Sequence, residues 1–145
     1  MSFEQDYILR MIRKVINTLA QAMGLLDKAK IEQAEELLDE AFEEVTQMSI
    51  EMLEQQSPDS LAYLLGLKGN PETLLMAAQI LFHKSKAFVQ KGDPITGQLM
   101  LRFSSKLLKK IQNPFKSSEV QNVFQKLVKD VELSLTGNAA DKTVD

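Results

Sequence analysis

Apolar and polar positions follow a helical period along most of the chain. Apolar residues three and four positions apart lie on one face of an α-helix, so their recurrence predicts a helix over residues 3–26. Ile16 and Met23 widen its apolar face beyond a coiled-coil seam, which favours one helix of a bundle. The face is formed by Ile8, Ile12, Val15, Leu19, Ala22 and Leu26.

A second amphipathic pattern predicts a helix over residues 30–46. Its outer positions are almost all acidic, and its inner positions are apolar. The spacing continues through Met48, Met52 and Leu53, which predicts an extension to Gln55 with a kink near Ser49. The predicted inner face consists of Ile31, Ala34, Leu37, Leu38, Ala41, Phe42 and Val45.

Turn residues divide the rest of the chain. Two helix starts have a capping residue followed by proline in the first helical turn: Ser57 with Pro58, and Asn70 with Pro71. They predict helices over residues 58–67 and 71–91. In the sequence 92–94, Gly92 can end one helix in the left-handed conformation, and Asp93 can cap the next. A helical hairpin over residues 70–112 follows, with its second helix ending near Ile111.

The two hairpin helices each carry a wide apolar surface, which requires other helices to cover it. The predicted apolar positions are Leu74, Leu75, Ala78, Leu81, Phe82, Ser85, Phe88 and Val89, then Ile95, Leu99, Leu101, Phe103, Leu107, Leu108 and Ile111.

A last helix is predicted over residues 118–135, with Gly137 ending it. All four prolines, Pro114 included, fall between helical patterns. A chain of 145 residues is normally one domain. The sequence therefore predicts an all-α fold of about six antiparallel helices, with a single domain over residues 1–137 and a disordered tail over residues 138–145.

Two segments resemble the second helix of a tetratricopeptide repeat. In the first segment, the small residues Ala34 and Ala41 flank the bulky Leu38. In the second, Gly97 and Ser104 flank Leu101 at the same intervals. Upstream of the second segment, Ser85 and Phe88 occupy the small and aromatic positions of a first helix. Lys84 departs from the pattern, which has an apolar residue there. The resemblance implies a degenerate array of helical hairpins or a right-handed superhelix, in which the first helices line a shallow groove.

The opening, Phe3-Glu4-Gln5-Asp6-Tyr7-Ile8, is similar to the start of a small family of bacterial all-helical proteins without an assigned activity. This second resemblance implies a bacterial origin and a helical-repeat fold. It implies no site residues.

Composition narrows the possible chemistry. The chain has no cysteine and one histidine, so cysteine chemistry and metal sites with two histidines are excluded. We expect His83 to be a packing or surface residue. No phosphate-binding glycine loop or nucleophile motif is present, and no apolar run approaches the length of a membrane span. The sequence predicts a cytoplasmic protein that is not an enzyme and needs no cofactor or metal.

Charge is unevenly distributed along the chain. Residues 27–59 hold eleven acidic and two basic residues, whereas residues 84–129 hold ten basic and two acidic residues. A solvated basic face is the usual outcome of such a pattern. The residues at helical spacing within the basic half, which we call the basic ridge, are Arg102, Lys106, Lys109 and Lys110.

Three hypotheses follow for function. The favoured one is a protein–protein interaction module that binds a peptide or helix in its groove. The second is a structural protein that self-associates by pairing the acidic helix 30–46 of one copy with the basic helices 84–129 of another. The third is a binder of phosphate ligands or nucleic acid through the basic ridge, although no nucleic-acid motif is evident. The repeat alignment places these residues in the groove: Gln79, Phe82, Lys86, Val89 and Gln90.

Overall fold

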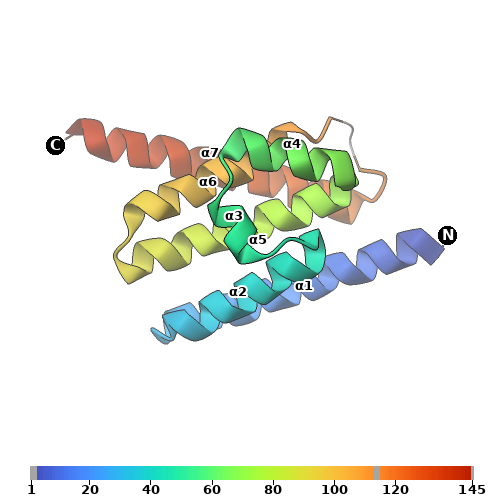
Figure 1. Cartoon of the computed structure of the whole chain (residues 1–145), viewed down its shortest axis with the longest axis horizontal. Coiled ribbons are helices and arrows are strands. Elements are labelled where there is room, and N and C mark those ends of the chain that lie inside the picture. The colour runs from blue at the N-terminus through green and yellow to red at the C-terminus, as the bar shows by residue number, and fades with distance from the viewer. Residues whose placement is uncertain (1–2, 113–114, 145) are drawn as a thin grey trace.

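The computed structural model describes residues 3–112 and 115–144, and within these ranges it contains seven α-helices and no strand. The predicted all-α class is confirmed, and the predicted count of about six helices is too low by one. The helices, shown in Figure 1, are α1 Phe3–Asp27, α2 Ile31–Thr46, α3 Ile50–Glu54, α4 Pro58–Lys68, α5 Pro71–Lys91, α6 Pro94–Lys109 and α7 Ser118–Val144.

Helix α5 is the centre of the molecule. All nine residues from Leu74 to Phe82 are buried, so this stretch has no solvent-facing side. A helix that is apolar all round must be covered on every side. Helices α1, α2, α6 and α7 all pack against α5, and α4 covers part of α6. Figure 1 shows α1 and α2 together on one side of α5 and α6 on the other.

The buried apolar residues form one cluster to which α1 to α7 all contribute. Five of the six predicted core positions of α1 are buried, and Ile8 is half-buried. Ile95 was predicted to face the core but is 81% exposed, on the side of the first turn of α6 that α5 does not cover. Among the helices of the described ranges, none is both long and apolar enough to cross a membrane.

The hairpin turn between α5 and α6 has the predicted chemistry. Gly92 adopts a left-handed conformation (φ 96°) and its N–H donates to backbone carbonyls of the last turn of α5. The Asp93 carboxylate accepts a hydrogen bond from the N–H of Thr96 at 3.1 Å. Hydrogen bonds from Thr96 lower the pKa of Asp93 below its usual value. Pro94 then occupies the first turn of α6, where its missing N–H leaves no hydrogen bond unmade.

The predicted extension of the acidic helix to Gln55 is wrong. Gln47 takes the left-handed conformation and ends α2, and the separate short helix α3 begins after the cap residue Ser49. The Thr46 hydroxyl donates to the carbonyl of Phe42 at 2.7 Å and accepts from the N–H of Met48 at 3.1 Å. These two bonds replace helical ones, so the break is locally stabilised.

The end of the last helix also differs from the prediction. Helix α7 runs to Val144, so Gly137 lies inside the helix and residues 138–144 continue it. Gly137 does not adopt the left-handed conformation that ends helices. Helix α6 ends at Lys109, two residues before the predicted end. Pro114 lies outside the described residues.

Small residues bring α5 and α6 close together. A Cβ atom at Gly97 would lie 3.0 Å from the backbone oxygen of Ser85 and 2.9 Å from the Cγ2 atom of Val89. Ser104, buried deeper in the same interface, donates its hydroxyl to the carbonyl of Ala78 at 2.8 Å. Residues of this size permit a close approach that larger side chains would prevent.

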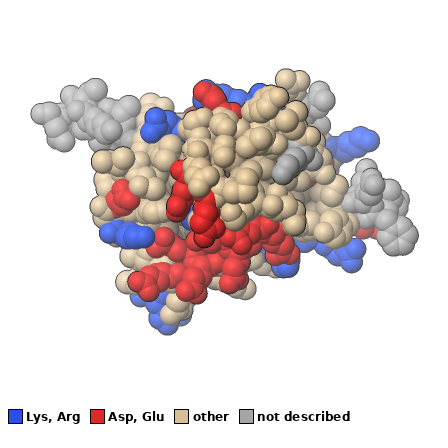
Figure 2. Space-filling view, viewed as in Figure 1, with Lys and Arg blue, Asp and Glu red and all other residues tan. Residues whose placement is uncertain are grey.

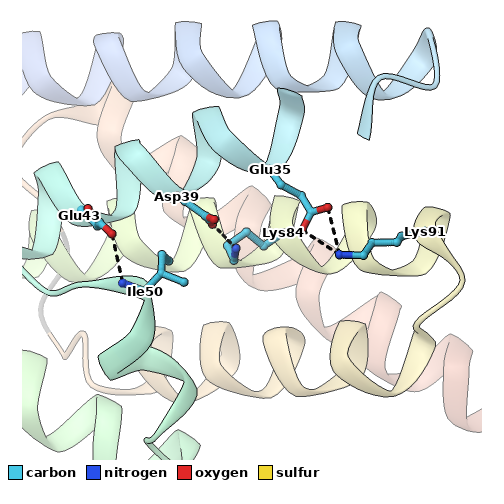
Figure 3. A network of polar contacts seen from close by, with 6 residues as sticks. All are labelled: Glu35, Asp39, Glu43, Ile50, Lys84 and Lys91. Atoms are coloured by element: carbon cyan, nitrogen blue, oxygen red, sulfur yellow. Dashed lines mark hydrogen bonds and ion pairs between the residues drawn. The ribbon is translucent and has the colours of Figure 1, made fainter. Parts of the chain in front are cut away.

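Three polar contacts join the acidic helix α2 to its neighbours (Figure 3). Lys84, only 3% exposed, pairs with Asp39, and Lys91 lies 3.3 Å from both carboxylate oxygens of Glu35. Glu43 accepts a hydrogen bond from the N–H of Ile50 at 3.2 Å, which ties α2 to α3. Lys84 is the position that departs from the tetratricopeptide pattern, and its side chain reaches from α5 to α2.

Substitution of Gly97 by alanine should destabilise the protein by about 1–3 kcal/mol, because its Cβ would push α6 away from α5. Gly24→Ala is the matched control, since nothing lies within 4 Å of a Cβ there and Gly24 lies inside α1. Alanine at that position should stabilise by about 0.5–1 kcal/mol. Urea unfolding measures both, and equal effects of the two substitutions would contradict the close approach.

Removing the two sides of the buried ion pair should have unequal effects. Asp39→Ala leaves the Lys84 ammonium buried without its partner and should cost about 1–3 kcal/mol or more. Lys84→Met should cost less, because methionine fills the space and Asp39 is exposed enough to be hydrated. The comparison requires urea unfolding of both variants. A larger loss for Lys84→Met would show that the pair itself stabilises the fold.

Candidate partner-binding groove

Helices α1 and α7 leave a groove between them, with α5 as its floor. We call this 350 Å³ concavity the α1/α7 groove. Helix α1 supplies one wall and α7 the other. The lining consists of Ile16, Leu19, Ala20 and Met23 from α1, Gln79, Phe82, His83 and Lys86 from α5, and Val123, Lys126, Leu127 and Asp130 from α7.

The lining of the groove is apolar along its walls and charged at its edge. The α1 wall contributes no ionisable side chain, and α7 contributes Lys126 and Asp130. From the floor, the exposed Lys86 places its Nζ atom 4.7 Å from the centre of the Phe82 ring. This distance is within the range of a cation–π interaction. An apolar surface bordered by a few charges is typical of peptide-binding grooves.

Gln79 and His83 are the two uncharged polar side chains of the floor, and they differ in their hydrogen bonding. Gln79 is 7% exposed, and its Oε1 atom is buried with no hydrogen-bond partner among the described residues. A buried unpaired acceptor of this kind is unusual and carries an energetic cost. His83 Nδ1 lies 2.8 Å from the carbonyl oxygen of Gln79. Since a carbonyl oxygen only accepts, Nδ1 carries the proton in this hydrogen bond.

The electrostatic state of His83 follows from its position. Burial lowers the pKa of His83 below its usual value of 6.5. The hydrogen bond to Gln79 opposes this shift, the nearby positive charge of Lys86 adds to it, and Asp130 opposes it. The ring also packs edge-on against Phe82, with 5.5 Å between the ring centres. His83 therefore stays neutral to a lower pH than a solvent-exposed histidine.

A second concavity continues from the groove along α5. This 380 Å³ space, the α6/α7 hollow, shares Phe82 and Lys86 with the groove, so the two concavities adjoin at these side chains. Leu101 of α6 and Leu133 of α7 also line it. Leu133 is one of the few large apolar side chains that are mostly exposed, at 61%.

All five residues assigned to the groove from the repeat alignment line one or both of these concavities. Gln79 lies in the groove, Val89 and Gln90 lie in the hollow, and Phe82 and Lys86 lie in both. Gln90 also has a structural contact, because its Nε2 atom donates to the carbonyl of Leu26 at 2.7 Å. The same carbonyl also accepts from the N–H of Ala29 at 3.0 Å, so Gln90 adds a second hydrogen bond at the end of α1.

The basic ridge is on the surface, at the end of α6. Arg102, Lys106, Lys109 and Lys110 are all exposed, and Lys110 is the cap residue just beyond the helix. The Nζ atom of Lys106 lies 3.1 Å from a carboxylate oxygen of Asp59 in α4. The ridge is therefore partly neutralised within the chain.

The acidic residues gather over α2, as Figure 2 shows on the face nearest the viewer. Three of them have basic partners in the same chain: Glu35 with Lys91, Asp39 with Lys84, and Glu44 with Lys14, at 2.8 Å for the last pair. In the described part of the chain, no three histidine, aspartate or glutamate side chains are placed to hold a metal ion.

The residues predicted for the groove lie along its floor or in the adjoining hollow, and the prediction named no residue of the walls. Residues 118–135 were predicted as a helix without a place in the groove, and the α1 wall was read only as a widening of the apolar face. That widening was the available signal, because Ile16 and Met23 line the groove. His83 packs against Phe82, in agreement with the expected packing or surface position, and its hydrogen bond to Gln79 was not predicted.

Comparisons of the chain with protein-family models, with curated proteins and with solved structures find no match.

The stability of the protein should fall as the pH drops below about 6.5, in part because of His83. The unfolded chain takes up a proton at the usual pKa, whereas folded His83 takes it up only at lower pH, so protonation favours unfolding. His83→Asn can keep the hydrogen bond to Gln79 without titrating. The stability advantage of the wild type over this variant should shrink between about pH 8 and pH 5, by at most about 1.4 kcal/mol per pH unit. Denaturant unfolding at each pH measures it, and a constant difference would contradict a lowered pKa.

Proposed function

We propose that this protein is a non-catalytic protein–protein interaction module that binds its partner in the α1/α7 groove and the adjoining α6/α7 hollow. The observation that carries the proposal is a pair of adjoining, mostly apolar concavities along α5, with α1, α6 and α7 at their sides. Grooves formed by helices commonly bind a helix or an extended segment through apolar anchors.

The hairpin arrangement is consistent with the tetratricopeptide-like array that the sequence suggests. In the proposed array, α1 with α2 and α5 with α6 are the two hairpins, and α1 and α5 are their first helices. Both first helices line the groove. Small residues at Ala34 and Gly97 are buried where the proposed repeats require close contact.

Self-association through α2 has less support. Leu38 and Phe42 on its apolar side are fully buried within the same chain, and three of its acidic residues already have basic partners. A second copy would therefore meet only the remaining acidic surface. Exposed ion pairs of this kind contribute little binding free energy.

The proposal is tested by blocking the groove without disturbing the core. Ala20 is exposed and lines the α1 wall, so Ala20→Glu places a long charged side chain in the groove. Gln21→Glu is the matched control, because Gln21 is an exposed neighbour on α1 outside the lining and receives the same charge change.

We expect affinity capture from the protein's own cells to recover the same partners with the wild type and with Gln21→Glu. Ala20→Glu should lose them by at least about tenfold, since an apolar contact surface then contains a buried charge. Unchanged capture by Ala20→Glu would rule out the groove as the binding site. Circular dichroism and thermal unfolding confirm that both variants are folded.

A further inference from the structure

We propose that the ligand of the α1/α7 groove is an amphipathic helix of another protein, with carboxylate side chains beside its apolar stripe. This inference rests on the proposed function and specifies the chemistry of the partner.

The shape of the groove fits a helix. On the α1 wall, Ile16, Ala20 and Met23 follow one another at spacings of four and three, so they form a strip along the helix. Val123 and Leu127, four apart, form the facing strip on α7. Two helices that lie on a third and diverge leave a channel with apolar sides. A fourth helix can fill such a channel with its own apolar stripe.

The charges around the groove favour an acidic ligand. Lys86 and Lys126 are both exposed, and Asp130 is the one acidic residue of the lining. The Lys86 ammonium lies over the Phe82 ring. A carboxylate that pairs with Lys86 would therefore lie next to the site where an apolar side chain packs on Phe82. On the ligand, acidic residues should then flank the apolar stripe.

The acidic surface of α2 repels an acidic ligand, which leaves the groove as the favoured place for it to bind. Lys84 of α5 faces α2, as its pairing with Asp39 shows. Lys86 is two residues further along, which is about 200° around the helix. The groove and the acidic α2 surface therefore lie on different sides of α5. An acidic ligand is repelled from α2 and attracted to Lys86 and Lys126.

A second copy of this chain does not meet these requirements. Its acidic helix α2 buries its apolar stripe, at Ala34, Leu38 and Phe42, in its own core. Another protein must therefore supply a helix that presents both apolar and acidic residues.

Selection from a displayed peptide library tests the inference. Each peptide has about 18 residues, or about 27 Å as a helix. Leucines are placed at a fixed helical spacing, and the flanking positions vary among Glu, Lys, Gln and Ser. Folded full-length protein serves as the bait. We expect the selected peptides to favour Glu over Lys at the flanking positions by at least about tenfold.

Charge reversal supplies the controls. The double variant Lys86→Glu and Lys126→Glu should reverse the preference toward Lys. Lys109→Glu with Lys110→Glu makes the same charge change on exposed residues outside the groove lining, and should leave the preference for Glu unchanged. Circular dichroism shows that each variant is folded.

The possible outcomes separate the two proposals. If no peptide of any charge is selected by the wild type over Ala20→Glu, the groove binds no helix and this inference is overturned, whereas the proposed function fails only if Ala20→Glu also captures the same partners as the wild type. If peptides are selected at the groove but Lys or neutral residues do as well as Glu, only the inference of an acidic ligand is overturned. A homodimer that the Lys86→Glu and Lys126→Glu variant dissociates would instead identify a second copy as the occupant.

Discussion

The burial of nine consecutive residues of α5, Leu74 to Phe82, is the constraint from which the rest of the architecture follows. Nine consecutive buried residues cannot be covered by one partner, so the chain places α6 on one side, α1 and α2 on another, and α7 on a third. Among the side chains that the structure describes, Lys84 is the one charged residue in the core, and it adds a directional requirement to this packing. It has to meet Asp39, and this fixes how α2 lies along α5. The groove is the part of the surface around α5 that these helices leave open.

Local sequence signals predicted most of the fold. Capping residues followed by proline mark where α4 and α5 begin, and the turn at residues 92–94 determines the hairpin, because each acts through its own backbone chemistry. The break at Gln47 escaped prediction, since the apolar period passes through it in phase and only the Thr46 hydroxyl bonds reveal it. Gly137 was misread because glycine can end a helix or continue it, depending on a conformation that composition does not determine.

The candidate site was predictable in part, and for a clear reason. Residues such as Phe82 and Lys86 lie on one helix, so their common face follows from the helical period. The walls come from α1 and α7, more than thirty residues away in the chain, and no local pattern brings Ala20 opposite Val123. The unpaired Oε1 atom of Gln79 likewise became visible only when the surrounding helices were in place. A hydrogen-bond donor on a ligand in the groove would supply the partner that this oxygen lacks among the described residues.

The separation of charge between α2 and the groove has a kinetic consequence. A molecule with a negative surface on one side and cationic edges on another has a large electric dipole moment, and a charged partner exerts a torque on it during approach. An anionic partner thus meets the protein already rotated toward a productive encounter, which raises the association rate at low ionic strength. At physiological salt, where screening acts within about 8 Å, this orientation takes place only in the last steps before contact.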